Sequence, residues 1–280
     1  MITKTWDELQ IKDDYIFAKV MRDKDICKGV IEKLLHIKVK DLEYIEEQKS
    51  IDISYDAKSV RLDVYVEDTD KVFNIEMQTT NQKGLAKRSR YYQGMIDLNT
   101  IEKGENYKKL KESYIIFICT FDPFDKGMAQ YSFTNCCLED SSLTLDDGTM
   151  KIFFNTKDYK KANDAEIQAF LRYINGEYSE NPFVKKLEDR VKQVKENKEW
   201  RAEYMNFMLR EQEIREEEFE KGVEHGIEQG IEQGIEQGEK LKAIAVAKNM
   251  IAADMEVDFI SNMTGLTKDE VEVLIQNTKL

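Results

Sequence analysis

The sequence predicts a mixed α/β domain followed by a helical arm. Runs of β-forming residues alternate with helix-periodic segments up to about residue 180, and the chain after Pro182 is charged and free of β-type runs. With 280 residues and only two prolines, the chain has the length for one sizeable domain and an appendage. We therefore expect one folded core and a helical tail.

The expected core begins with a helix and continues into a sheet. Residues 14–36 place apolar side chains at helical spacing, which predicts a single helix packed on a core. Three β-type runs follow, at 51–55, 61–67 and 72–78, and are typical of an antiparallel meander. The remaining elements expected are a helix at about 83–103, a central strand buried on both faces at 113–121, strands at 131–134 and 150–155, and a short helix at 164–173.

Composition divides the chain into four segments. The core is expected to span 1–180, a heptad-like helical arm 181–221, a repeat connector 222–238, and a small helical module 239–280. In the last segment, Thr267 and Glu270 predict a capping box at the start of the final helix.

The connector contains Gly-Ile-Glu-Gln three times between Gly226 and Gln237. Each glycine costs a helix interior about 1 kcal/mol relative to alanine, so the stretch needs a partner or stays mobile. One interpretation is close packing of helices through the glycines, giving a homo-oligomer through the C-terminal helices. The other is a flexible connector produced by tandem duplication.

The helix-turn-helix spacing of the last module also suggests DNA reading. The helix that would enter the groove carries Asp269, Glu270 and Glu272, which have the wrong sign to face phosphates. We therefore interpret the module as a helical interaction module.

Charge and cysteine usage limit the class of protein. The net charge of −13 repels a polyanion unless basic residues gather on one face. One segment has such a surplus, with eight basic residues against three acidic ones: Lys83, Lys87, Arg88, Arg90, Lys103, Lys108, Lys109 and Lys111. The four cysteines form no CxxC pair, which argues against structural zinc. With no membrane span and no signal peptide in the sequence, we expect a cytoplasmic protein.

The hairpin formed by 61–67 and 72–78 carries the candidate catalytic residues. Whether its turn has two residues or four, the numbers of opposed residues sum to 139, so Asp63 lies opposite Glu76. Opposed like charges destabilise a sheet, and a divalent cation would offset their repulsion. Gln78 points to the same strand face and could orient water. The alternative is a hairpin with one wet face, whose polar residues merely meet solvent.

The residues also resemble a known family. Asp63, Glu76 and Gln78, in the order D, spacer, E-x-Q, resemble the PD-(D/E)XK nuclease signature, with glutamine where lysine is commoner. The wider sequence is similar to the recombination-promoting nuclease/putative transposase (Rpn) family at 14–17, 75–78, Arg88 with Tyr91 and Tyr92, 104–107 and 115–121.

The resemblance implies a restriction-endonuclease-like core, a mixed sheet flanked by helices, that cuts DNA with Mg²⁺ or Mn²⁺. Asp63, Glu76 and the Met77 carbonyl would ligate the metal, and Gln78 would stand in the lysine position. Asp14 would supply an outer carboxylate. These roles imply phosphodiester hydrolysis by water.

Lys87 and Arg88 are the candidates for contact with DNA phosphates, and a solvated helix face is the alternative for both. The competing function is a catalytically inactive nuclease fold that binds DNA or protein, or that oligomerises.

Overall fold

The computed structural model describes residues 4–40, 42, 44–51, 60–81 and 83–278. The chain separates into two compact units, residues 1–206 and 207–280. Each unit is described by itself below.

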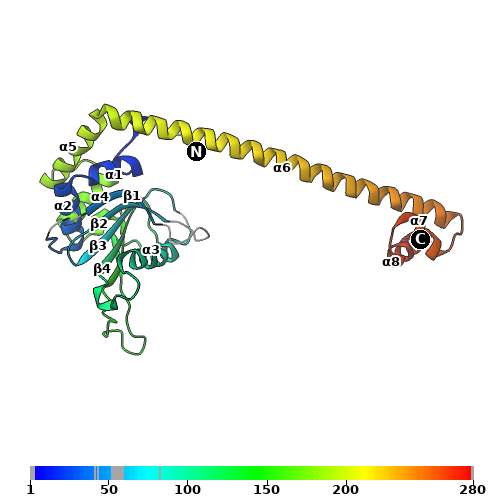
Figure 1. Ribbon diagram of the computed structural model, residues 1–280, viewed down its shortest axis with the longest axis horizontal. Helices are drawn as coiled ribbons and strands as arrows, with labels where there is room; N and C mark the ends of the chain where they lie inside the picture. The colour runs from blue at the N-terminus through cyan, green and yellow to red at the C-terminus, as the bar shows by residue number, and fades with distance from the viewer. Residues whose placement is uncertain (1–3, 41, 43, 52–59, 82, 279–280) are drawn as a thin grey trace. The chain divides into compact units, whose positions relative to one another are not determined.

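A mixed sheet forms the centre of the first unit (Figure 1). Among the described residues its order is β1-β2-β3-β4-β6-β5. Strands β1, β2 and β3 form an antiparallel meander, β3, β4 and β6 run parallel, and β5 pairs antiparallel with β6. The strands are β1 (Tyr44–Ile51), β2 (Val60–Glu67), β3 (Lys71–Gln78), β4 (Glu112–Cys119), β5 (Gln130–Phe133) and β6 (Thr149–Asn155).

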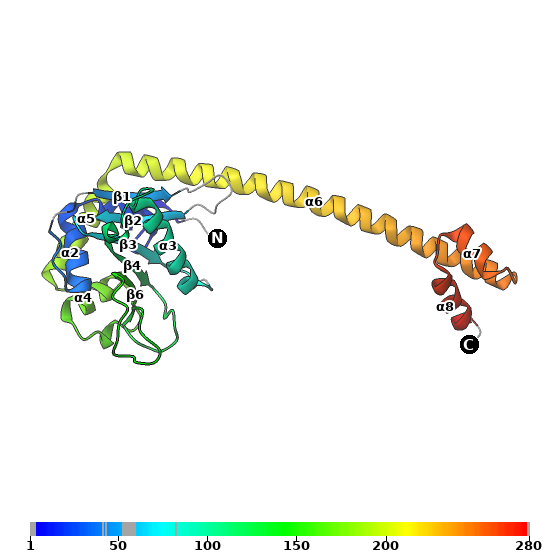
Figure 2. The ribbon, with the colours of Figure 1, turned by 60° about the horizontal axis from the view of Figure 1, so that its bottom comes forward.

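Helices cover both faces of this sheet. Helix α3 (Leu85–Thr100) lies over one face, and four helices that each contact at least two of the others lie over the opposite face (Figures 1 and 2). These four are α1 (Asp14–Met21), α2 (Lys24–Leu35), α4 (Ala165–Ile174) and α5 (Pro182–Glu196). The expected mixed sheet flanked by helices, followed by a helical C-terminal region, is confirmed.

The central strands are hydrophobic because they are buried on both faces. Ile115, Ile116, Phe117 and Ile118 of β4 have no exposed surface, as the sequence predicted for a central strand. On the α3 side, the ring of Phe117 stacks on that of Phe153 with 5.1 Å between their centroids. This packing joins β4 to β6, and the other edge of β4 pairs with β3, which carries Glu76.

The first expected helix is wrong in one respect, because 14–36 forms two helices. Asp23 lies between α1 and α2 in an extended conformation, and its carboxylate accepts hydrogen bonds from the backbone N–H groups of Asp25 and Ile26. This N-cap begins a new helix and breaks the periodicity. The last residue of the expected segment, His36, has φ 54° and ends α2.

The expected strand at 51–55 lies largely outside the described residues. The first strand observed, β1, instead covers Tyr44–Ile51. Its centre reads Glu-Glu-Gln-Lys, so apolar alternation does not reveal it. A polar sequence is common in strands at the edge of a sheet, where β1 lies.

The first turns of α6 (Lys198–Ala252) belong to the first unit and pack on its N-terminal segment. Trp6, Tyr15 and Tyr204 form a cluster of rings with centroids 5.2 to 5.9 Å apart. The buried ammonium of Lys19 lies 3.1 Å from the carboxylate of Glu203. These contacts join α1 to the start of α6.

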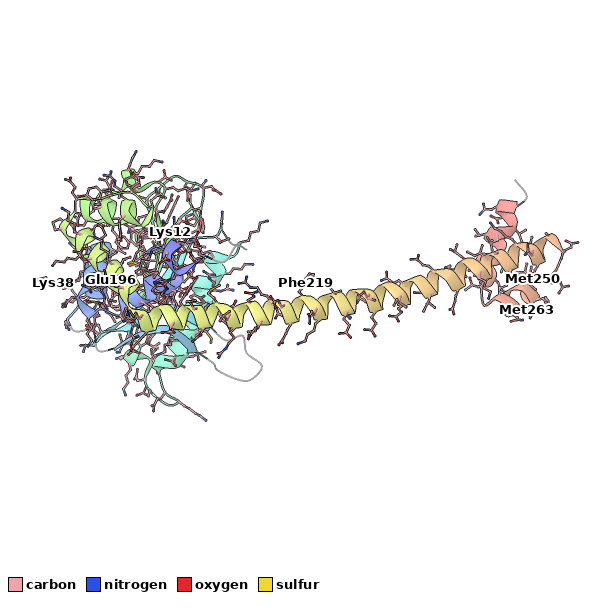
Figure 3. The ribbon with its side chains drawn as sticks, turned by 90° about the horizontal axis from the view of Figure 1, so that it is seen from above. Lys12, Lys38, Glu196, Phe219, Met250 and Met263 are labelled. Atoms are coloured by element: carbon pink, nitrogen blue, oxygen red, sulfur yellow. The ribbon has the colours of Figure 1, made fainter. Side chains whose placement is uncertain are left out.

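The second unit consists of the rest of α6, α7 (Val257–Thr264) and α8 (Lys268–Thr278). Figure 3 places Met250 and Met263 in this unit. Its small core contains Ala247, Ile260, Leu266 and Val271. The expected capping box is confirmed, since the Glu270 carboxylate accepts from the N–H of Thr267 and the Thr267 hydroxyl accepts from the N–H of Glu270.

The repeat lies within α6, a helix of 55 residues. Its isoleucines are exposed, and no described atom beyond the helix's own backbone lies within 4 Å of a Cβ built on Gly226, Gly230 or Gly234. The fold of the single chain therefore gives no steric reason for these glycines. None of the described helices combines the length and apolar character that a membrane crossing requires.

Candidate active site

The candidate site lies where the β2–β3 ladder ends. The observed pairs Val64–Ile75, Tyr65–Asn74, Val66–Phe73 and Glu67–Val72 all have the predicted register. The next positions along this register are Asp63 and Glu76. At these positions a side-chain carboxylate of each strand accepts a hydrogen bond from the backbone of the other strand.

The two carboxylates bond to the backbone of the opposite strand. Glu76 Oε1 accepts a hydrogen bond of 3.1 Å from the N–H of Asp63. Asp63 Oδ2 accepts one of 3.0 Å from the N–H of Met77. These reciprocal bonds hold both acidic side chains between β2 and β3, at the point where the strands stop pairing.

The environment of Glu76 disfavours its negative charge. Its side chain is buried, and burial together with the nearby charge of Asp63 raises the pKa of Glu76 to about 8. The N–H of Asp63 and the charge of Arg88 act in the opposite direction on this pKa. Two acidic groups are thus held together where only one ionises readily without a cation.

Gln78 and Met77 lie beside the carboxylates. Gln78 pairs with Cys119 of β4, is partly exposed, and follows Glu76 on the same strand face. The N–H of Met77 points toward Asp63, and a strand residue directs its N–H and its C=O to the same side. The Met77 carbonyl therefore faces the β2 side of the strand, where Asp63 lies.

The structure separates Lys87 from Arg88. Lys87 is exposed on α3, whereas Arg88 is partly buried and points inward over the sheet. The guanidinium carbon of Arg88 lies 5.6 Å from the centroid of the Tyr92 ring and 5.4 Å from that of Phe117. The inward position of Arg88 does not fit a solvated helix face, and its contact with a DNA phosphate stays a prediction.

A signal for the inward position exists in the sequence. Arg88 follows Leu85 by three residues and precedes Tyr92 by four, so all three belong to one helical stripe. Leu85 and Tyr92 are buried in the observed core. A charged residue within an apolar stripe that follows the E-x-Q strand marks a candidate site residue.

Asp14 occupies a different element. It is the first residue of α1 and is exposed, and α1 packs on α2, α5, β1 and β2. Its role as an outer carboxylate stays a prediction.

The donor set fits a divalent cation through two carboxylates and a carbonyl. In the described part of the chain, no group of three or more His, Cys, Asp or Glu side chains is arranged to hold a metal. Hard cations such as Mg²⁺ keep several waters and use one or two protein carboxylates. Buried Glu76 and partly buried Asp63 supply that number of carboxylates.

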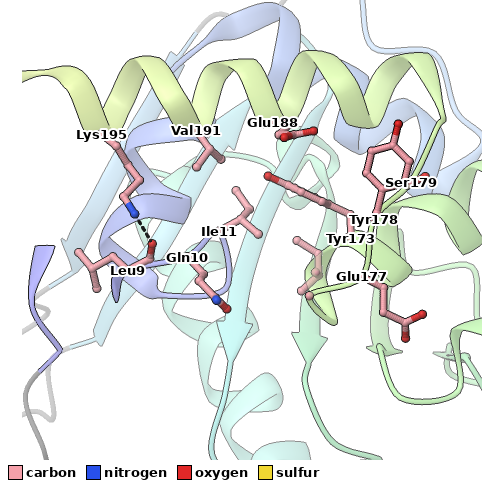
Figure 4. Close-up of a pocket in the computed structure, with 12 residues that line it drawn as sticks. Leu9, Gln10, Ile11, Tyr173, Glu177, Tyr178, Ser179, Glu188, Val191 and Lys195 are labelled. Carbon is pink, nitrogen blue, oxygen red and sulfur yellow. Dashed lines mark hydrogen bonds between the residues drawn. The ribbon is translucent and has the colours of Figure 1, made fainter. Parts of the chain in front are cut away.

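A separate cavity lies among other elements of the first unit (Figure 4). It has a volume of about 300 Å³ and lies between the N-terminal segment, the end of α4 and α5. Lys195 Nζ donates a 3.0 Å hydrogen bond to the Leu9 carbonyl at its wall. Asp63, Glu76 and Gln78 are not among its lining residues.

Comparison with known proteins agrees with this geometry. Residues 12–224 match the family model described as PD-(D/E)XK nuclease family transposase. The chain belongs to this family. No curated protein and no solved structure matches the chain. The match confirms the resemblance to the Rpn/putative transposase family, and membership in the PD-(D/E)XK nuclease family suggests a nuclease with DNA as its substrate and a divalent cation as its cofactor.

Proposed function

We propose that this PD-(D/E)XK family member is a metal-dependent endonuclease that hydrolyses DNA phosphodiester bonds in the cytoplasm, in a setting of recombination, transposition or defence. The observation that carries the proposal is the reciprocal pair of Asp63 and Glu76. A buried carboxylate beside a second, partly buried one is costly to ionise unless a cation neutralises the pair. The charged pair would therefore destabilise the metal-free chain, and a bound cation would offset this destabilisation.

Each residue of the site has an assigned role. Asp63, Glu76 and the Met77 carbonyl would hold Mg²⁺ or Mn²⁺, and Asp14 would act from outside this set. The cation, when bound, supplies positive charge near the scissile phosphate and the attacking water. The Gln78 amide orients that water through a hydrogen bond, and Lys87 contacts a neighbouring DNA phosphate.

The test is nicking of supercoiled plasmid with Mg²⁺, Mn²⁺ or EDTA. We expect metal-dependent nicking by the native chain and a loss of at least 10²-fold in Asp63→Asn and Glu76→Gln. Asp70→Asn is the matched control, because Asp70 lies exposed in the turn of the same hairpin. Circular dichroism and thermal unfolding verify the fold of each variant.

Equal nicking by the native chain and both site variants would point to a contaminant and contradict the assignment. An absence of nicking under all conditions would favour the second candidate, an inactive nuclease fold that binds DNA or protein. This candidate predicts that Asp63→Asn binds a duplex as tightly as the native chain, with no turnover in either.

We also propose that the chain forms a homo-oligomer through α6. Val223, Ile227, Ile231 and Ile235 form an apolar row at four-residue spacing, with exposed fractions of 44 to 58%. The row Gly222 to Gly238 lies next to it on the same helix. A row of this spacing is a ridge, and a neighbouring row without side chains is a groove.

The two rows make the helix complementary to a second copy of itself. The apolar ridge of one copy fits the glycine groove of the other, and ridges of this spacing cross at about −50°. A close helix approach also accounts for glycines that the single chain does not require.

Sedimentation equilibrium tests this association. Replacing Gly226, Gly230 and Gly234 by Ala should raise helix stability by about 1 kcal/mol per site and weaken association at least tenfold. Ile227→Ser with Ile231→Ser should weaken association without filling the groove. Replacing Gln229 and Gln233 by Ala, in another row, is the matched control. Association that persists in all variants would place the interface elsewhere.

A further inference from the structure

Arg88 is a cation held inside the site rather than on its rim. It is the fourth residue of α3, and its backbone N–H donates a 2.9 Å hydrogen bond to the Gly84 carbonyl in the first turn. Its guanidinium lies over the rings of Tyr92, one turn later, and Phe117 of β4. Arginine is suited to such stacking because its planar group is weakly hydrated.

The ring beneath the guanidinium is next to the candidate site. Phe117 is the β4 residue paired with Glu76, and Cys119 is the one paired with Gln78. The guanidinium therefore lies over the stretch of sheet where Glu76 and Gln78 meet β4.

We propose that Arg88 supplies the positive charge that lysine supplies in the commoner form of the E-x-K motif. In this chain the motif position holds Gln78, which has no charge. Arg88 reaches the same place from α3, contacts the scissile phosphate oxygens and stabilises the charge that develops there. It acts through charge and N–H donation, and no proton transfer is assigned to it. This role rests on the proposed nuclease function.

Other basic residues near the start of α3 do not share this position. Lys83, Lys87 and Arg90 are exposed. They can attract DNA from outside, whereas Arg88 combines partial burial with a place beside Glu76. A residue inside the site should affect the chemical step, whereas an exposed one should affect DNA binding and its salt dependence.

A purely structural role for Arg88 is the competing explanation, because its stacking on two rings also stabilises the core. Arg88→Ala alone does not separate the two. The separating variant is Arg88→Ala combined with Gln78→Lys, which returns a cation to the site from the strand without restoring the stacking. Arg172→Ala is the matched control, since Arg172 lies exposed on α4 over the opposite face of the sheet.

The experiment measures kcat and KM for plasmid or duplex cleavage by the full chain, with the thermal midpoint of each variant. We expect Arg88→Ala to lower kcat by about 10²- to 10³-fold with a smaller change in KM. In the Arg88→Ala background, Gln78→Lys should raise kcat at least tenfold. Arg172→Ala should keep kcat within about twofold.

A second readout does not depend on cleavage. Removing the positive charge beside Glu76 should increase the affinity of the DNA-free protein for Mn²⁺ at least threefold in Arg88→Ala, measured by calorimetry, and leave it unchanged in Arg172→Ala.

The outcomes separate this inference from the proposed function. Two results would overturn the role of Arg88 while the nuclease function stands, provided that the native chain cleaves. In the first, Arg88→Ala raises KM and leaves kcat unchanged. In the second, Arg88→Ala lowers kcat and Gln78→Lys does not restore it. If the native chain does not cleave, the nuclease function and the role of Arg88 are both overturned.

Discussion

The acidity of Glu76 makes the stability of the apo chain depend on pH. Because its folded pKa is raised to about 8 from an ordinary value of 4.5, the folded chain keeps a proton that the unfolded chain releases. The resulting stabilisation is complete below pH 4.5 and is lost as pH rises through about 8. The free energy of unfolding in EDTA should therefore fall between pH 5 and pH 8.

Glu76→Gln isolates this contribution, because glutamine resembles the protonated acid and does not titrate. Relative to the native chain, the variant should gain about 2–4 kcal/mol between pH 5 and pH 8 in urea unfolding. Asp70→Asn should show no such gain. Parallel stability curves for native chain and Glu76→Gln would mean that Glu76 ionises freely in the folded protein.

A divalent cation should reverse this pH dependence. Cation and proton compete for the pair of Asp63 and Glu76, so Mg²⁺ should raise the thermal midpoint more at pH 8 than at pH 6. Asp63→Ala should remove most of the Mg²⁺ effect at both pH values. An unchanged Mg²⁺ effect in that variant would place the cation elsewhere.

At the residue scale, the sequence predicted which carboxylates meet, because strand periodicity and a short turn determine the register. The contacts of Asp63 and Glu76 with opposite backbone N–H groups could not be predicted. They depend on where the two strands stop pairing, which the rest of the sheet decides. The inward position of Arg88 likewise depends on the ring of Phe117, more than 25 residues later in the chain.

At the scale of elements, the break between α1 and α2 gives a stability prediction. Asp23→Ala removes the cap of α2 and should destabilise the folded chain by about 1 kcal/mol in urea unfolding. Asp25→Ala is the control, since Asp25 lies in the same turn and its side chain is not the cap. Equal losses in the two variants would indicate a general charge effect at this helix end.

The elements that the sequence predicted well are those with strong periodicity and buried faces. The central strand β4, the hairpin β2–β3 and the helices α3 and α4 lie close to their expected ranges. The two errors, the α1–α2 break and the missed strand β1, arose where tertiary context decides. A capping aspartate interrupted an apolar pattern, and a polar edge strand showed none.

At the scale of the whole molecule, acidity is unevenly distributed. Residues 207–280 contain eight lysines and arginines against seventeen aspartates and glutamates, so they carry −9 of the net charge of −13. The remaining −4 belongs to the unit that holds the candidate site. The second unit therefore carries most of the net negative charge of the chain.

Removing this charge should strengthen DNA binding by the first unit. A chain of residues 1–206 should bind a short duplex several-fold more tightly than the full chain at low salt, measured by fluorescence anisotropy. The difference should shrink as salt rises, because salt screens charges beyond about 10 Å at 0.1 M. Weaker binding by the shortened chain would show that the second unit contributes contacts or avidity.

The four-residue period of α6 has a consequence for how this helix can change. One repeat unit advances the helix by about 6 Å and turns it by about 400°, so the next unit lies nearly above the last. Deleting or duplicating a unit therefore leaves each row continuous and changes only the number of its members. Because the three Gly-Ile-Glu-Gln units are identical, adding or removing one of them would change the length of α6 in equal steps of about 6 Å.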